Sequence, residues 1–202
     1  YYLEYLNKRA SLWEKQSLTK ARVLWGEESF SKRISDEISE TISVLPLPAR
    51  WTTEVRSMRK RVELERTSRL AAGPDLKVGK GGLVDLEFLI QALQLRFGGQ
   101  RRHIRIPNSS DALQAIGEAG LIKKSEAKKA KANLKLLRTL ETLIRLNSES
   151  TEFVLPDDPL LLRSLAVATG ETSVQRLKTR IRNLKSQNHR LLQEALRRAG
   201  AR

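Results

Sequence analysis

The residues with the clearest capacity for chemistry stand in the segment 75–99, which reads DLKVGKGGLVDLEFLIQALQLRFGG. It contains a Lys-x-Gly-x-Gly-Gly loop, residues 77–82, whose glycines permit unusual backbone angles and the close approach of a ligand or another part of the chain. A glycine-rich loop that opens a helix can also bind an anion through its free backbone N–H groups, and Lys77 and Lys80 would favour a phosphate. The spacing matches neither a P-loop nor a dinucleotide-binding fingerprint, so close packing and anion binding both stay open.

Three carboxylates could be buried and would then need partners. Asp85 and Glu87 fall in the first turn of the helix that follows the loop, where acidic side chains interact favourably with the helix dipole. Glu141 stands among leucines in a second expected helix, where an apolar residue would be expected. A buried carboxylate is costly unless it is paired, so Glu141 should contact Arg138, Arg145 or a basic residue of another helix.

Other common chemistries find no support in the composition. The chain has no cysteine, which excludes disulfides and thiol chemistry and makes a reducing cytosol the simplest location. His103 and His189 stand far apart and no acidic or histidine cluster has metal-ligand spacing, so no metal site is expected. No apolar run approaches the roughly 20 residues of a membrane helix, and the N-terminus does not resemble a signal peptide. Because the chain starts without Met, we expect a fragment of a longer protein.

The element that must position the loop is the helix at about 83–97. Apolar residues recur in it at spacings of three and four, and others fill most of the remaining circumference. A helix that is apolar nearly all round is surrounded by other elements, so we predict a central, buried helix. Glu87, Gln91 and Gln94 form a narrow polar stripe along it, whose partners should be basic residues on neighbouring helices.

Periodicity and breakers predict the other elements. No stretch alternates with period two, so we expect an all-α, multi-helix bundle of about seven or eight helices in a single domain. Within it, 1–74 would hold the N-terminal helices and 75–202 a bundle that the glycine loop opens. The expected helices are 2–24, 28–44, 51–72, 83–97, 108–120, 125–147, 160–169 and a final one from 174. The buried stripe of the first helix is expected to be Leu3, Leu6, Ala10, Trp13, Ser17, Ala21 and Leu24. The final helix has a heptad-like seam with Asn188 as its one polar member, suited to packing across the bundle or to a coiled-coil partner.

Four ordered stretches resemble one known family. The pattern K-x-G-x-G-G-L-x-D-L-E-F, followed by Q-x-L-Q-L-R, resembles the signature segment of the glutamine synthetase adenylyltransferase family, bifunctional enzymes that attach AMP to glutamine synthetase and remove it. The other three stretches are WEKQSLTKARVLWGE at 13–27, EVRSMRKRVE at 54–63 and LRTLETLIRLNSES at 137–150. In the last of these Thr142 replaces a histidine of the family pattern, so we carry over no role from that histidine.

The resemblance implies the helical part that follows a nucleotidyltransferase core. The family's core binds Mg²⁺ and ATP with acids in a Gly-Ser and Asp-x-Asp motif, and this chain contains neither, so no catalytic residue is expected in it. The parent enzyme would transfer AMP from ATP to a tyrosine of glutamine synthetase, or remove it by phosphorolysis, in the cytoplasm. Its partners would be glutamine synthetase, a PII-type signalling protein and the core of its own chain. The D-L-E-F form favours the adding half over the removing half.

The family also suggests roles for residues around the loop. Lys77 and Lys80, with Gly81 and Gly82, would line the side of the nucleotide cleft that faces the core. The carboxylates would instead fix the buried architecture by pairing with arginines of the helix that begins at Trp51.

That arginine-rich helix permits two interpretations. Its cations alternate with acids, as in a salt-bridged surface helix. Alternatively, Arg56 and Arg59 contact a nucleotide phosphate or the carboxylates of the central region. The carboxylates expected to pair with them are Asp85, Glu87 and Glu141.

The net charge leaves two further classes of function open. Thirty-eight Lys and Arg against 23 Asp and Glu give a formal net charge of +15, spread over every expected helix. Solvated helix faces explain most of it, and an anionic partner would explain the rest. The alternatives are a basic nucleic-acid-binding module, against which the resemblance argues, and a non-catalytic docking scaffold built on the final helix. The basic connection Arg101 to His103, with Arg105, is a further candidate anion contact.

Overall fold

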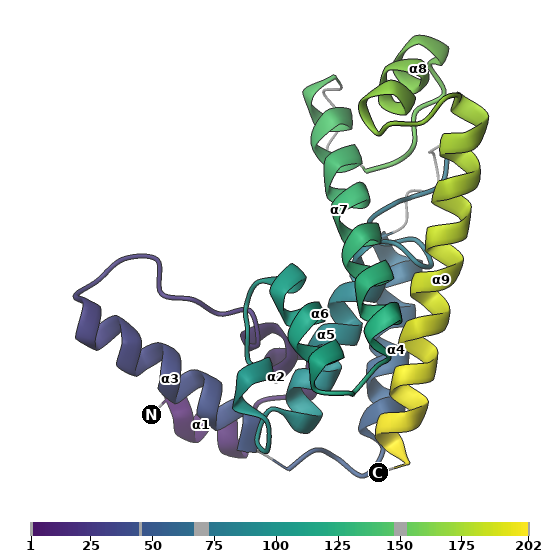
Figure 1. Ribbon diagram of the computed structural model, residues 1–202. Coiled ribbons are helices and arrows are strands. Elements are labelled where there is room, and N and C mark those ends of the chain that lie inside the picture. Colours follow the sequence, from purple (N-terminus) through teal and green to yellow (C-terminus); the bar gives the residue numbers. More distant parts are fainter. Residues whose placement is uncertain (1, 45, 67–72, 148–152, 202) are drawn as a thin grey trace.

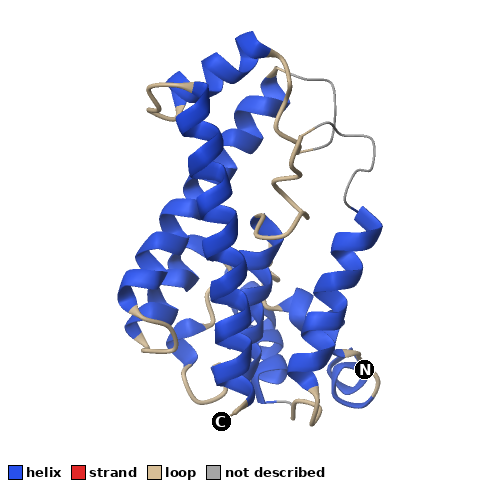
Figure 2. Ribbon diagram, turned by 90° about the vertical axis from the view of Figure 1, so that its right-hand side faces the viewer, coloured by secondary structure: helices blue, strands red, loops and turns tan. Residues whose placement is uncertain are grey.

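The protein is built from helices. A computed structural model describes residues 2–44, 46–66, 73–147 and 153–201, and within these ranges it contains no strand, only an isolated bridge between Asp75 and Val154 (Figure 2). The all-α prediction is confirmed. Nine α-helices are described where about seven or eight were expected, because the first expected helix is divided in two. The elements are α1 (Tyr2–Lys8), α2 (Leu12–Leu18), α3 (Glu28–Val44), α4 (Trp51–Arg66), α5 (Leu83–Phe97), the 3-10 helix η1 (Arg102–Ile104), α6 (Ser109–Glu118), α7 (Lys124–Leu146), α8 (Pro159–Ala168) and α9 (Val174–Gly200).

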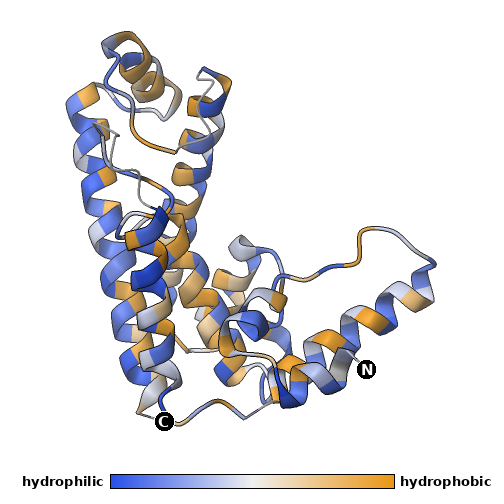
Figure 3. Ribbon diagram, turned by 180° about the vertical axis from the view of Figure 1, so that it is seen from behind, coloured by the Kyte–Doolittle hydropathy of each residue, from blue (hydrophilic) through white to orange (hydrophobic). Residues whose placement is uncertain are grey.

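The helix α5 is the centre of the fold, as its all-round apolar sequence predicts. Twelve of its fifteen residues are buried. The long helix α9 packs along it, and α2, α3, α4, α6 and α7 contact its other sides (Figure 1). In Figure 3 the ribbon of α5 is mostly hydrophobic, whereas the helices around it alternate between hydrophilic and hydrophobic residues. The loop at the N-terminus of α5 is thereby held between α4 and α9.

The N-terminal segment is not the continuous helix that was expected over residues 2–24. A new helix, α2, begins after Ser11 because the Glu14 carboxylate accepts a hydrogen bond from the Ser11 N–H at 2.8 Å. The break changes which side chains face inwards: Gln16 is buried, whereas Trp13 is 59% exposed. The prediction that Trp13 belongs to the core is therefore wrong.

Among the other expectations for the N-terminal half, one is wrong and two concern residues that lie outside the described part of the chain. Leu24 lies beyond the end of α2 and is 82% exposed, so its place in a buried stripe is also wrong. The side chain of Leu3 lies outside what the structure describes. The third expected helix was to reach residue 72; α4 is described to Arg66, and residues 67–72 lie outside the described ranges.

The seam of α9 is buried inside the protein. Leu177, Ile181 and Leu184 face its interior, and Asn188 is buried with them at 1% exposure. The helix packs against α4, α5, α7 and α8, so the seam serves the bundle of this chain.

Candidate functional site

The glycine loop is held first by the aspartate that precedes it. Asp75 Oδ1 accepts hydrogen bonds from the backbone N–H groups of residues 77, 78 and 79, at 2.8, 2.8 and 3.3 Å. The Asp75 carboxylate therefore occupies the position in which an anion bound to these three N–H groups would lie.

A second carboxylate, Asp85, holds the other end of the loop. It lies in the first turn of α5 and is fully buried. Its Oδ1 accepts a hydrogen bond from Arg59 Nε at 2.5 Å, and its Oδ2 accepts one from Gly81 N–H at 3.0 Å. His189 Nδ1 lies 2.9 Å from the same Oδ2. Asp85 thus joins α4, the loop, α5 and α9 at one point.

Arg59 contributes more than the pairing with Asp85. Its Nη2 donates to the carbonyl oxygens of Val78 at 2.8 Å and Gly79 at 3.3 Å. Its Nη1 lies 3.5 Å from Glu63 Oε2 and, among the described residues, has no hydrogen-bond partner. The guanidinium is 5% exposed, so its charge is neutralised inside the fold and is not presented to a ligand.

The helix α9 completes the support of the loop. Lys185 Nζ donates to the carbonyl oxygen of Asp75 at 2.5 Å, and Asn188 Nδ2 donates to the carbonyl oxygen of Gly81 at 3.0 Å. Burial lowers the pKa of Lys185, while the nearby carboxylates of Asp75, Asp85 and Glu63 act in the opposite direction.

Close packing accounts for the glycines. Gly81 has φ +77°, and a Cβ there would lie 1.9 Å from the carbonyl oxygen of Lys185. A Cβ on Gly82 would lie 2.6 Å from the carbonyl oxygen of Leu76, and one on Gly79 would lie 2.5 Å from that of Asp75. Each glycine is needed because a backbone carbonyl oxygen of another residue occupies the space that a side chain would fill.

The lysine side chains of the loop are its exposed charges. Lys80 is exposed, and Lys77 is half-exposed with its Nζ 3.7 Å from Glu141 Oε1. The backbone N–H groups of residues 77, 78, 79 and 81 are bound to Asp75 and Asp85, so these two ammonium groups are the charges that the loop could offer to an anion outside.

The structure separates the carboxylates that were expected to share Arg56 and Arg59. Asp85 does pair with Arg59, whereas Glu87 pairs with Lys20 from the segment after α2, at 2.7 Å. The expected pairing of Glu87 with either arginine is therefore wrong. Arg56 Nε instead donates to Gln193 Oε1 at 3.2 Å, which links α4 to α9.

Glu141 is paired with basic residues, as expected for a carboxylate among apolar side chains. Its Oε1 lies 2.9 Å from Arg145 Nη2, one turn along α7, and also contacts Lys77. Through Lys77 it connects α7 to the glycine loop, and it does not meet Arg56 or Arg59.

The polar stripe of α5 is satisfied mostly without basic partners. Gln91 Oε1 accepts from Gln16 Nε2 at 2.8 Å, and Gln94 Nε2 donates to the carbonyl oxygens of Ile104 and Ile106 at 2.9 and 2.8 Å. The expectation of basic partners holds for Glu87 and is wrong for the two glutamines, since an amide can pair with another amide or with a carbonyl.

Three residues of the site were not identified from sequence: Lys185, Asn188 and His189. Asn188 carried a signal, as the one polar residue of an apolar seam. Lys185 stands three residues before Asn188 and four before His189 on the same helix, where residues three and four apart share a face. His189 is 104 residues from Asp85, and no spacing rule connects them.

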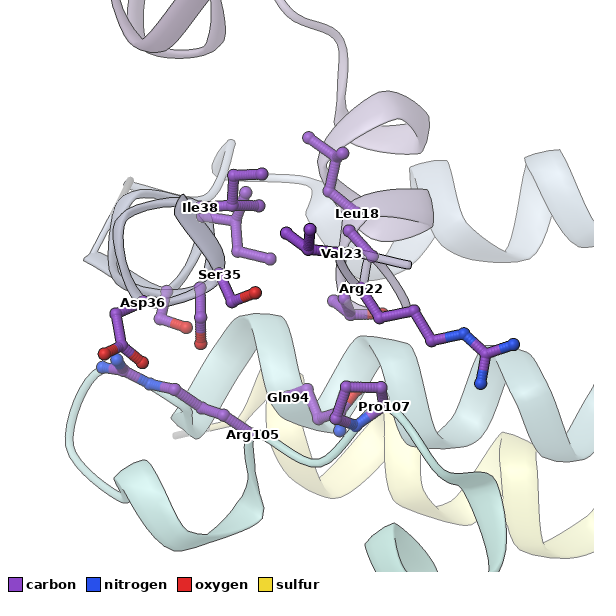
Figure 4. Close-up of a pocket in the computed structure, with 14 residues that line it drawn as sticks. Leu18, Arg22, Val23, Ser35, Asp36, Ile38, Gln94, Arg105 and Pro107 are labelled. Carbon is purple, nitrogen blue, oxygen red and sulfur yellow. The ribbon is translucent and has the colours of Figure 1, made fainter. Parts of the chain in front are cut away.

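A separate hollow of about 270 Å³ lies between the end of α2 and α3, with Gln94 of α5 in its wall. Figure 4 shows Asp36 and Arg105 at one end of it and Arg22 directed away. Arg105 Nε donates to the carbonyl oxygen of Gly98 at 2.9 Å, and burial lowers the pKa of this guanidinium. Its Nη2 is buried without a partner among the described residues.

Two further arginines of the basic connection before α6 are paired within the chain. Arg101 donates to the carbonyl oxygen of Ala119, and Arg102 lies 2.5 Å from Glu40 on α3. Over the described ranges, no group of three or more acidic, histidine or cysteine side chains could hold a metal ion. No described helix is long and apolar enough to cross a membrane.

Comparisons with known proteins agree with the sequence motifs. A family model described as GlnD PII-uridylyltransferase matches residues 50–198. Bifunctional glutamine synthetase adenylyltransferase/adenylyl-removing enzymes are similar over most of the chain. The protein of Mycobacterium avium is 33% identical over 83% of this chain and 17% of its own length, and that of Cutibacterium acnes is 34% identical over 82% and 17%. That of Mycobacterium tuberculosis is 33% identical over 77% and 16%. The chain thus spans less than a fifth of the length of these relatives.

Proposed function

The chain belongs to the glutamine synthetase adenylyltransferase/adenylyl-removing enzyme family, and on that premise we propose that it is the helical domain beside a nucleotidyltransferase core. The parent enzyme transfers AMP from ATP to a tyrosine of glutamine synthetase, or removes it. The observation that carries the proposal is the similarity to these enzymes over 83% of the chain.

In this proposal the domain positions and does not catalyse. Nucleotidyl transfer needs carboxylates that are free to bridge Mg²⁺. Asp85 is bound by Arg59, Gly81 and His189, and Glu141 by Arg145 and Lys77, so neither is free for that role. Mg²⁺ and ATP would be bound mainly by the core.

The glycine loop would form a rigid wall of the nucleotide cleft. Its backbone is fixed by Asp75, Asp85 and Lys185, and its exposed ammonium groups are those of Lys77 and Lys80. Preorganised charges of this kind stabilise a developing negative charge without reorganising during the reaction. The two lysines would therefore face the phosphates of the nucleotide.

The names of the two families found by comparison indicate which part of the nucleotide the domain could recognise. The model that matches residues 50–198 is named for a uridylyltransferase, and the curated relatives are named as adenylyltransferases. A segment shared by both is suited to a common part of the reaction, such as the phosphates, and not to the base. Glutamine synthetase, a PII-type regulator and a cytoplasmic location belong to the same proposal.

The test uses the intact enzyme that contains this chain. The double variant Lys77→Ala, Lys80→Ala should lower kcat/KM for adenylyl transfer by roughly tenfold or more, through lost phosphate contacts. Lys32→Ala with Lys129→Ala, on exposed faces of α3 and α7, is the charge-matched control and should leave kcat/KM unchanged. Equal activity of the loop variant and the control would refute the cleft-lining role, provided that both unfold at the wild-type temperature.

A further inference from the structure

One face of α7 carries a continuous row of positive charge. Seven positions separated by four and three residues line up along this helix, since such steps keep side chains on one face. Six of the seven are basic, and none is acidic. This α7 stripe consists of Lys124, Lys128, Lys131, Lys135, Arg138, Thr142 and Arg145.

The acids of α7 neutralise the stripe only at its C-terminal end. Glu126 accepts a hydrogen bond from the backbone N–H of Lys123 at 2.9 Å and so caps the helix. Glu141 is bound to Arg145 at the far end. In the part of the chain that the structure describes, the four cations Lys124, Lys128, Lys135 and Arg138 form no ion pair.

The arrangement works against the stability of α7 itself. Like charges three or four residues apart destabilise a helix, and the stripe places five cations in succession at that spacing. The corresponding row of basic residues on α9 is interrupted, because Asn183, Gln187 and Glu194 stand between its arginines. A row that opposes its own helix, and in which four cations have no ion-pair partner among the described residues, is suited to a partner outside.

A hollow runs beside the stripe with an apolar floor. It lies along α7, reaches Ser110 at the start of α6 and encloses about 670 Å³. Ala132 and Leu143 supply apolar surface, and the cations from Lys128 to Arg138 surround it. Leu146, at the end of the helix, is 75% exposed. The surface therefore combines charge with apolar contact area.

We propose that the α7 stripe and its hollow dock an acidic, amphipathic helix of a partner protein. From Lys124 to Arg145 the stripe extends about 30 Å, the length of a partner helix of similar size. Two helices share the same rise per residue, so carboxylates three and four apart on the partner meet cations at matching intervals. Apolar residues between those carboxylates fill the hollow.

The chemistry of the hollow favours such a helix over nucleic acid. None of the described residues that line it is aromatic, and stacking on aromatic side chains is how single-stranded bases are commonly bound. The phosphate backbone of a nucleic acid would form ion pairs with the cations but would leave the apolar surface of the hollow exposed to water. Charge complementarity together with apolar burial identifies the helix as the occupant.

The experiment measures binding of a fluorescent 21-residue peptide, with glutamates three and four apart beside leucines, to the 202-residue chain. The stripe variant carries Lys128→Glu, Lys135→Glu and Arg138→Glu. The matched control carries Lys178→Glu, Arg182→Glu and Arg190→Glu on the exposed face of α9, with the same change in net charge. We expect the stripe variant to lose roughly tenfold or more in affinity and the control less than about threefold.

Two further probes distinguish the occupants. A scrambled peptide of the same composition should bind roughly tenfold more weakly than the amphipathic one, because its apolar residues no longer share a face. Equal binding of the two peptides, equal losses in both variants, or no binding to the wild type would overturn the proposal. So would a 20-base-pair duplex DNA that binds more tightly than the peptide and loses affinity only in the stripe variant.

Discussion

At the scale of single residues, two aspartates decide the structure of the site. Asp75 binds three N–H groups of the glycine loop, and Asp85 binds its last segment together with Arg59 and His189. The loop that resembles an anion-binding element has thus been closed by carboxylates of its own chain. What remains for an external anion is the pair of lysine side chains, Lys77 and Lys80.

The substitution Gly81→Ala tests how closely the loop and α9 approach. Gly81 and Gly170 have the same φ of +77°, but only at Gly81 would a Cβ meet backbone, 1.9 Å from the carbonyl oxygen of Lys185. Gly170→Ala should cost about 1 to 2 kcal/mol from its backbone conformation alone. Gly81→Ala should cost about 3 to 5 kcal/mol, measured by urea unfolding. Equal losses in the two variants would mean that α9 yields easily and that the contact is soft.

The buried ammonium of Lys185 predicts a dependence of stability on alkaline pH. Burial lowers the pKa of Lys185 in the folded chain below its ordinary value of 10.5. Between the lowered and the ordinary pKa the unfolded chain binds more protons, so the free energy of unfolding rises with pH in that window. Below the window both states are protonated and the effect is constant.

The difference between wild type and Lys185→Met isolates this effect. The free energy of unfolding of the wild type should increase relative to this variant as the pH rises from 7 towards 10.5. Lys178→Met, at an exposed position of the same helix, is the control and should show no such trend. A flat difference for Lys185→Met in denaturant titrations would show that the ammonium is not penalised by burial.

Sequence reasoning identified part of the site and missed the part that depends on distant contacts. The loop and Asp85 stand out because residue types at fixed local spacing carry the signal, and the pairing of Asp85 with Arg59, 26 residues away, was an expectation from the family resemblance. His189 does not, because 104 residues separate it from Asp85 and only the packing of α9 along α5 brings them together. The glutamines of α5 were given the wrong partners because the sequence shows which groups need hydrogen bonds but not which neighbours supply them.

At the scale of elements, apolar periodicity predicted helices well and their interruptions less well. The central helix was expected from its sequence because ten of the fifteen residues of 83–97 are apolar and are spread around most of its circumference. The division between α1 and α2 was missed, since a continuous stripe can be drawn through Trp13 when the cap formed by Ser11 and Glu14 is overlooked. A local capping interaction there outweighs the periodic pattern.

The polar residue in the seam of α9 gives a prediction about how this helix holds the loop. Asn188 donates to the carbonyl oxygen of Gly81 at 3.0 Å and accepts from Asn133 Nδ2 at 2.9 Å. Asn188→Leu would extend the apolar seam but would leave these groups without partners, so it should destabilise the chain by about 1 to 3 kcal/mol.

The control for this substitution lies on the same helix. Asn183 is exposed, so Asn183→Leu should change the free energy of unfolding by less than about 0.5 kcal/mol. Amide hydrogen exchange provides a second measurement: the N–H of Gly81 donates to Asp85, and it should exchange faster in Asn188→Leu because the loop loses the hydrogen bond that holds the Gly81 carbonyl to α9. A stabilised Asn188→Leu variant with unchanged exchange would show that the seam, and not the hydrogen bond, governs this contact.

At the scale of the whole molecule, the dominant quantity is the net charge. A formal +15 on 202 residues means that the folded chain is strained by repulsion between its own cations, with the α7 stripe as its densest row. The buried pair of Arg59 and Asp85 is shielded from salt, whereas the exposed cations are not.

Added salt should therefore stabilise the fold. Raising NaCl from about 50 mM to about 500 mM shortens the screening length from roughly 14 Å to roughly 4 Å, which removes most repulsion between exposed cations. We expect Tm to rise by several degrees in differential scanning calorimetry. The variant with Lys128→Glu, Lys135→Glu and Arg138→Glu carries less positive charge, so its Tm at low salt should equal or exceed that of the wild type and should rise less with salt. A Tm that falls with salt would mean that exposed ion pairs such as Arg102 with Glu40 outweigh the repulsion, and that the stripe imposes no cost on the isolated chain.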